Sequence, residues 1–133
     1  MKTEFFMAMA KVPTVTHQEK KVDVVHGKPI FYEPAELKEA RSKLIAYLLP
    51  HKPTEPFTGP VELMVKWCFP TEGKRKSGTY RKTKPDTDNL QKLLKDCMTR
   101  CGFWKDDALV VREIVEKFWN DPSGIYICVR ELI

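Results

Sequence analysis

The sequence predicts an α+β fold, a small and mostly antiparallel or mixed β-sheet with two helices in a single domain, 1–133. Three observations predict it. Val61 to Phe69 alternates apolar and polar side chains, as a half-buried strand does. Leu90 to Cys101 carries apolar residues at helical spacing. Shorter apolar stretches separated by turn residues lie on both sides of this pair. A chain of 133 residues is long enough to bury about two-thirds of its unfolded surface.

The amino-terminal part predicts one strand and one hairpin. Phe5 to Ala10 forms the first strand. Lys21 to Tyr32 forms a hairpin that turns at His26 and Gly27, because glycine supplies the positive φ of tight turns.

The first helix follows this hairpin. Pro34 suits its start, Ala35 to Leu49 has apolar residues near helical spacing, and Pro50 ends it. The proline-rich stretch 51–60 is expected to be a linker.

The second half of the chain supplies the clearest elements. One face of the strand Val61 to Phe69 is wholly apolar. The second helix carries an apolar stripe and ends at Gly102. The apolar stripe consists of Leu90, Leu93, Leu94, Cys97, Met98 and Cys101.

The remaining chain predicts two strands. Leu109 to Trp119 also fits a helix, but its many β-branched residues favour a strand. Residues 120–124 have the composition of a turn, and Ile125 to Leu132 alternates as a closing strand.

Composition excludes several classes of protein. No apolar stretch approaches the roughly 20 residues that span a bilayer, and the start of the chain lacks a signal-peptide pattern, so we expect a cytoplasmic protein without a membrane partner. The four cysteines lack CxxC pairing, which favours reduced buried thiols, and the three histidines lie far apart in expected loops. A zinc site is therefore not expected.

Positive charge is concentrated in one loop. The net charge is +5, and the loop 71–85 carries six basic residues and one acid, which also gives +5. Such a loop, containing glycine and Tyr80, is either a solvated surface or a flexible arm that contacts nucleic-acid phosphates. Its candidate DNA-binding residues are Lys74, Arg75, Lys76, Arg81, Lys82 and Lys84.

Aspartates lie at both ends of the second helix. Asp86 and Asp88 precede it, where one acid could simply cap the helix, and Asp106 and Asp107 follow it. For a helix of roughly 14 residues the two pairs are about 20 Å apart, so spacing alone does not place them in one site. Carboxylates within a basic protein do suit Mg²⁺ or Mn²⁺, ions that can activate water for phosphodiester cleavage.

Two other uses of such acids fit poorly. A calcium EF-hand loop starting at Asp86 needs glycine and glutamate where Gln91 and Cys97 stand. An Asp-x-Asp sugar transferase needs a nucleotide-binding domain that this short chain lacks.

One motif runs through and beyond the second helix: Lys84-Pro85-Asp86-Thr87-Asp88-Asn89-Leu90-Gln91-Lys92, then Asp96, Gly102, Trp104 and Asp106-Asp107. This motif resembles the RusA family of Holliday junction resolvases, many of them from phages and prophages. The motif covers about 24 residues, and the amino-terminal half matches only loosely. Cys97-Met98 and Leu109 depart from the common pattern without touching the acids.

The resemblance implies a homodimeric, Mg²⁺-dependent endonuclease that makes paired nicks in four-way DNA junctions during recombination and repair, with Mn²⁺ as a substitute ion. It implies that Asp86, Asp88 and Asp107 bind metal and that Lys92 is the essential lysine. It assigns no role to Asp96 or Asp106, nor a preferred cleavage sequence.

Two alternatives stay open. The chain could instead be a non-catalytic, structure-selective DNA-binding protein, a decayed prophage resolvase. The apolar residues Phe5, Phe6, Met7, Met9 and Trp119 either complete the core or form the dimer interface.

Overall fold

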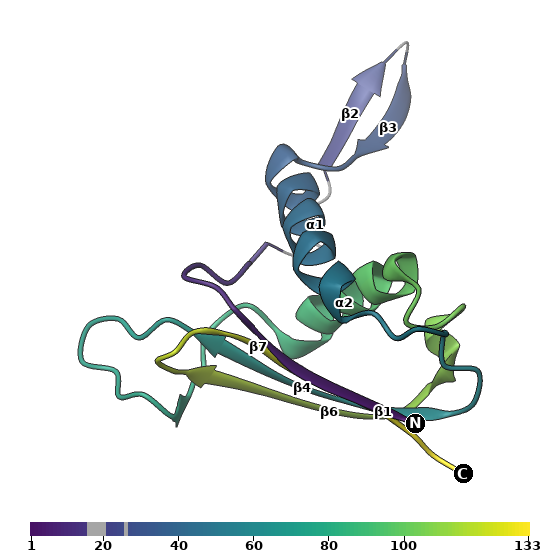
Figure 1. Ribbon diagram of the computed structural model, residues 1–133. Coiled ribbons are helices and arrows are strands. Elements are labelled where there is room, and N and C mark those ends of the chain that lie inside the picture. Colours follow the sequence, from purple (N-terminus) through teal and green to yellow (C-terminus); the bar gives the residue numbers. More distant parts are fainter. Residues whose placement is uncertain (16–20, 26) are drawn as a thin grey trace.

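The computed structural model describes residues 1–15, 21–25 and 27–133, and its centre is a five-stranded sheet below two helices (Figure 1). The strand order is β1-β7-β4-β6-β5. The strands are β1 (Lys2–Ala8), β4 (Val61–Phe69), β5 (Thr79–Tyr80), β6 (Val110–Trp119) and β7 (Gly124–Glu131). The α+β prediction is confirmed.

The sheet is mixed because β4 and β6 run parallel, whereas the β1–β7, β7–β4 and β6–β5 pairs are antiparallel. A parallel pair needs a long crossover, and here the chain between β4 and β6 contains the basic loop (71–85) and α2 (Thr87–Cys101). This crossover places the amino end of α2 and the turn after α2 at opposite ends of the β6 strand.

The core lies between the helices and one face of the sheet. Trp67 and Phe69 of β4 are 0% and 1% exposed, and the whole apolar face of that strand is buried as its alternation predicts. The apolar stripe of α2 is buried as well, and α1 (Ala35–Leu48) packs beside it. The opposite face of the sheet carries polar side chains, among them the partly exposed Lys66 and Tyr126 and the buried Glu62.

A small hairpin, β2 (Lys21–Val25) with β3 (Lys28–Tyr32), projects beyond the start of α1 (Figure 1). Gly27 has φ of 75°, the positive value expected at its turn. The predicted turn residue His26 and also His17 lie outside the described residues.

One expectation needs correction, and one open alternative is decided. The stretch 51–60 is more than a linker, because Phe57 is 1% exposed and its amide donates to the Phe103 carbonyl at 2.8 Å. Of the two alternatives for the apolar residues, the core is the one that holds for Met7, Met9 and Trp119, which are buried in it. Phe6 remains 38% exposed.

Short 3-10 turns follow α1, as η2 (Leu49–His51), and precede β6, as η3 (Asp107–Leu109). Among the described residues, no helix is long and apolar enough to cross a bilayer.

Candidate active site

Asp86 occupies the cap position of α2 but does not cap the helix with its side chain. No side-chain hydrogen bond reaches the helix amides from it, and its carboxylate pairs instead with the Lys84 ammonium at 2.8 Å. A capping aspartate is normally explained by the amides that it satisfies. The Asp86 carboxylate therefore lacks that structural explanation, and the partner that it has instead, Lys84, is an exposed side chain.

Cationic side chains hold the backbone just ahead of Asp86. Lys117 Nζ donates to the carbonyl oxygens of Thr83 and Pro85, both at 2.7 Å, and the Arg81 guanidinium donates to the Lys84 carbonyl at 2.6 Å. Three successive carbonyls are thus fixed from β6 and from the residue after β5.

Burial lowers the pKa of Lys117, the Arg81 charge lowers it further and Asp86 opposes the shift. The pair of carbonyl contacts explains why a lysine lies at this partly buried place.

Asp88 and Lys92 line a recess of about 320 Å³ between α2 and β6. We call it the Asp88 recess; its walls are Thr87, Asp88, Gln91, Lys92, Lys95, Glu113 and Val115. Both Asp88 and Lys92 are exposed and lie one helical turn apart. Neither side chain makes a hydrogen bond or ion pair within the described part of the chain. The acidic side chain of Asp88 and the basic side chain of Lys92 therefore line the same recess, and neither is engaged in a contact among the described residues.

A chain of hydrogen bonds forms the base of this recess. The indole N–H of Trp67, a side chain 0% exposed, donates to Gln91 Oε1 at 2.7 Å, and Gln91 Nε2 donates to Glu113 Oε2 at 2.7 Å. Lys95 Nζ donates to Glu113 Oε1 at 3.0 Å. Because an indole only donates, it fixes the orientation of the Gln91 amide, and Glu113 must accept at both oxygens.

Sequence reasoning missed Glu113 and Lys95. The available signal was an inward-facing tryptophan in a predicted strand, since a buried indole N–H needs an acceptor from another element.

Asp107 lies at the other end of α2 from Asp86 and Asp88. The 15 residues of α2 span about 22 Å, and the seven steps from Val110 to Lys117 along β6 span about 23 Å. Asp86 is close to Lys117, whereas Asp107 precedes Val110. Figure 1 shows the basic loop at one end of the sheet and the turn after α2 at the other. One chain thus brings Asp88 and Lys92 together and keeps Asp107 apart.

The neighbouring acids Asp106 and Asp107 differ in their contacts. The Asp106 carboxylate accepts the Ala108 amide at 2.9 Å and so caps η3. The Asp107 side chain is exposed and makes no hydrogen bond or ion pair to any residue that the structure describes. Within those residues, no group of three metal-ligating side chains forms in the single chain.

Asp96 has a structural explanation. Its carboxylate lies 3.7 Å from a guanidinium nitrogen of Arg41 on α1 and 3.6 Å from that of Arg100 on α2. It therefore ties the two helices together and stands apart from the Asp88 recess.

The basic loop is attached to the sheet rather than being structureless. Thr79 and Tyr80 form β5 against β6, and the Gly78 amide donates to the Trp119 carbonyl at 2.8 Å. The sequence predicted a loop here and not this short strand.

The predicted DNA-binding residues of this loop differ in their contacts. The guanidinium carbons of Arg75 and Arg81 each lie 4.5 Å from the Trp119 ring centre, and Arg81 also covers Phe69 at 4.3 Å. Lys74, Lys76 and Lys82 are exposed and make no side-chain hydrogen bond or ion pair inside the described ranges. These three lysines are the freest cations of the loop, and Lys84 is already paired with Asp86.

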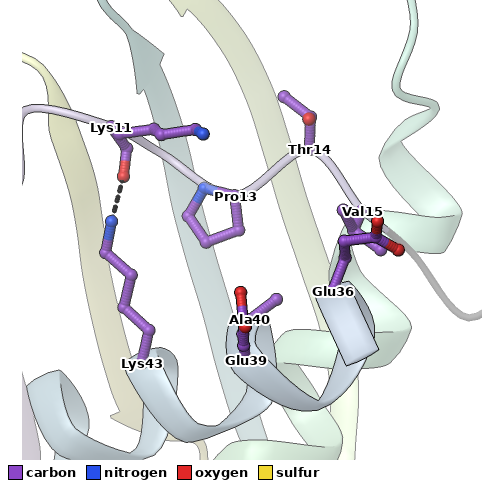
Figure 2. Close-up of a pocket in the computed structure, with 8 residues that line it drawn as sticks. All are labelled: Lys11, Pro13, Thr14, Val15, Glu36, Glu39, Ala40 and Lys43. Atoms are coloured by element: carbon purple, nitrogen blue, oxygen red, sulfur yellow. Dashed lines mark hydrogen bonds between the residues drawn. The ribbon is translucent and has the colours of Figure 1, made fainter. Parts of the chain in front are cut away.

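A second recess, of about 310 Å³, lies between residues 11–15 and α1 (Figure 2). Lys43 at one end of it donates from Nζ to the Lys11 carbonyl, and Glu36 and Glu39 lie along the same helix. This contact fastens the segment after β1 to α1. This second recess is far in sequence from every predicted site residue, and we assign the Lys43–Lys11 contact a structural role.

Comparison with known proteins agrees with the motif. The family model described as Endodeoxyribonuclease RusA matches residues 11–130. A protein of Lactococcus phage r1t named crossover junction endodeoxyribonuclease rusA is 32% identical over 134 residues, covering 99% of this chain and all of that protein. The uncharacterized protein YqaN of Bacillus subtilis (strain 168) is 30% identical over 118 residues, covering 80% of this chain and 82% of its own. The chain therefore belongs to the RusA endodeoxyribonuclease family.

Proposed function

We propose that this protein is a Mg²⁺-dependent endodeoxyribonuclease that resolves four-way DNA junctions by paired nicks. The observation that carries the proposal is the pair of aspartates at the start of α2: Asp86 makes no side-chain cap, and Asp88 lines a recess together with Lys92. The name of the phage r1t relative supports the substrate class.

The side chains fit a hard divalent cation. Asp86, Asp88 and Asp107 offer carboxylate oxygens, the ligands that Mg²⁺ and Mn²⁺ prefer, and all three carboxylates are at least partly exposed. Such a cation, when bound, activates water and stabilises the leaving oxygen of a phosphodiester. The braced backbone before Asp86 would hold one carboxylate in place for it.

The remaining groups act on the DNA. Lys92 is proposed to contact the scissile phosphate, because its ammonium is free and lines the same recess as Asp88. Lys74, Lys76 and Lys82 are proposed to contact phosphates further along the backbone, where each contact releases a counterion. Glu113 and Lys95 would keep the base of the recess rigid.

Dimerisation would complete the carboxylate set. The rise of α2 separates its two ends by about 22 Å, so an Asp107 of a second copy would be the one that joins Asp86 and Asp88. A two-fold dimer would contain two equivalent composite sites. A four-way junction with paired arms has the same symmetry, so each site would meet one of two equivalent strands.

The test is cleavage of a synthetic four-way junction by the pure protein in Mg²⁺, compared with EDTA and with a linear duplex of equal length. We expect paired nicks at symmetric positions of the junction in Mg²⁺ and no nicks in EDTA. Junction binding without nicks in either Mg²⁺ or Mn²⁺ would instead favour the non-catalytic DNA-binding protein.

A further inference from the structure

The basic loop and the end of β6 enclose a recess of about 450 Å³ that the proposed cleavage chemistry does not use. We call it the Tyr80 recess; it is lined by Arg75, Thr79, Tyr80, Lys82, Thr83 and Trp119. It combines aromatic rings with cations, the composition found where single-stranded nucleic acids bind.

Tyr80 is an exposed aromatic ring held in a fixed position. Tyr80 is 63% exposed, yet its ring stacks on Phe118 with centroids 4.9 Å apart and planes inclined by 21°. Its hydroxyl donates to Glu116 at 2.9 Å, and its backbone pairs with β6. Because the hydroxyl is already used, the ring face is what this residue offers to a ligand.

The cations of the recess flank that ring. Lys82 is exposed and makes no ion pair within the described residues, and the Arg75 guanidinium lies over Trp119. A ligand with a flat aromatic part and an attached anion would match both features, by stacking on Tyr80 and by pairing with Lys82. A nucleotide has this combination.

We propose that the Tyr80 recess binds one unstacked nucleotide of branched DNA, with its base on the Tyr80 ring and its phosphate near Lys82 and Arg75. Bases inside a linear duplex are stacked on both faces and cannot take this position without unstacking, which costs a few kcal/mol. Bases at a branch point have already lost part of their stacking. The recess would therefore favour branched over linear DNA; this inference rests on the proposed function for its substrate class.

The test measures binding in EDTA, where no cleavage occurs, to a four-way junction and to a linear duplex. Tyr80→Ala should bind the junction roughly 5- to 150-fold more weakly, the loss expected for one base stacked on an aromatic ring, and should bind the duplex as the wild type does. Tyr80→Phe keeps the ring and should bind both DNAs normally. Tyr47→Ala removes an exposed tyrosine on α1, 37% exposed, and is the matched control.

Two further measurements separate stacking from a general effect on the loop. Tyr80→Ala should keep the wild-type salt dependence of junction binding, because the phosphate contacts remain. Junctions without bases at the branch point should bind wild type and Tyr80→Ala equally, since the two changes remove the same contact.

Unchanged junction binding by Tyr80→Ala would overturn the proposal. Equal losses on junction and duplex, or a flattened salt dependence, would also overturn it, because the ring would then merely hold the loop. If the wild type binds junctions without cutting them and Tyr80→Ala still weakens that binding, the recess stands and the nuclease proposal fails. If the wild type cuts junctions and Tyr80→Ala binds them as the wild type does, the nuclease proposal stands and the recess proposal fails.

Discussion

The Lys117 ammonium on β6 donates to the Pro85 carbonyl at 2.7 Å, in the residue immediately before Asp86. The same ammonium donates to the Thr83 carbonyl at 2.7 Å. A strand of the sheet thus sets the position of the aspartate that begins α2. Lys117 touches no proposed substrate atom and acts as a positioning residue.

Lys117→Met should loosen the start of α2. Hydrogen bonds from charged groups contribute about 1.5 to 3 kcal/mol, and with partial exposure we expect the free energy of unfolding to fall by about 1 to 3 kcal/mol. Junction cleavage should slow because Asp86 is less well held, while junction binding should change little. Urea unfolding and single-turnover cleavage test this, with the exposed Lys105→Met as control. Unaltered stability and cleavage would show that the two carbonyl contacts are unimportant.

Gln91→Met should leave the buried indole N–H of Trp67 without an acceptor. An unpaired buried donor costs about 1 to 3 kcal/mol, so the variant should unfold at a correspondingly lower urea concentration. Lys92→Met, one residue along the same helix, should keep wild-type stability because its side chain is exposed, and yet should lose cleavage. Equal stability of Gln91→Met and wild type would contradict the hydrogen-bond chain.

Glu62 should make stability depend on pH. Arg112 donates to Glu62 at 3.0 Å and lowers its pKa below the ordinary 4.5; burial opposes this shift and Arg130, at 3.2 Å, adds to it. A lowered pKa in the folded state adds stability that is complete above the ordinary pKa and lost as pH falls through the folded value.

Wild type should therefore be more stable than Glu62→Gln at pH 7, and the difference should shrink below about pH 4.5. Urea unfolding at a series of pH values measures it, with the exposed Glu55→Gln as control. A difference that stays constant down to pH 2 would exclude the ion pairs as its cause.

The free lysines of the basic loop should set the salt dependence of DNA binding. Lys74, Lys76 and Lys82 changed together to Ala should weaken junction binding and reduce the slope of log affinity against log salt by about 0.9 for each lost phosphate contact. Binding titrations at several salt concentrations measure the slope. An unchanged slope would show that these lysines contact no phosphates and that the loop is an ordinary solvated surface.

The helix α2 and strand β4 could be predicted because their signals are local. Gly102 has φ of 91° at the end of α2, as the stop signal predicts, and alternate residues of β4 are buried. The short strand β5 could not be predicted, because Thr79 and Tyr80 lie in a charged stretch. They form a strand through their pairing with β6, which is distant in sequence.

The site was predictable to the extent that it lies within one motif. Asp88 and Lys92 are close in sequence and line the same recess, whereas Glu113 joins them through the register that pairs it with Leu63. The apolar spacing of Leu109 to Trp119 also fitted a helix, but its β-branched residues favoured a strand, and β6 confirms that prediction. Lys117 carried no signal, because its partners are backbone carbonyls, which every residue has.

The proposed metal site takes its acids from two chains. Asp88→Asn and Asp107→Asn should each be inactive alone, since each lacks a proposed metal ligand at both sites of its homodimer. In a mixed dimer of the two variants, one composite site would carry both changes and the other would be wild type. Junction nicking should then return in the mixture.

The decisive measurement is therefore nicking of a four-way junction by co-refolded Asp88→Asn and Asp107→Asn, with mixed dimers verified by two affinity tags. We predict that the mixture regains single-strand nicks, while co-refolded Asp86→Asn and Asp88→Asn, both altered at the same end of α2, stay inactive. A verified mixed dimer of Asp88→Asn and Asp107→Asn that remains as inactive as each variant alone would contradict the composite site.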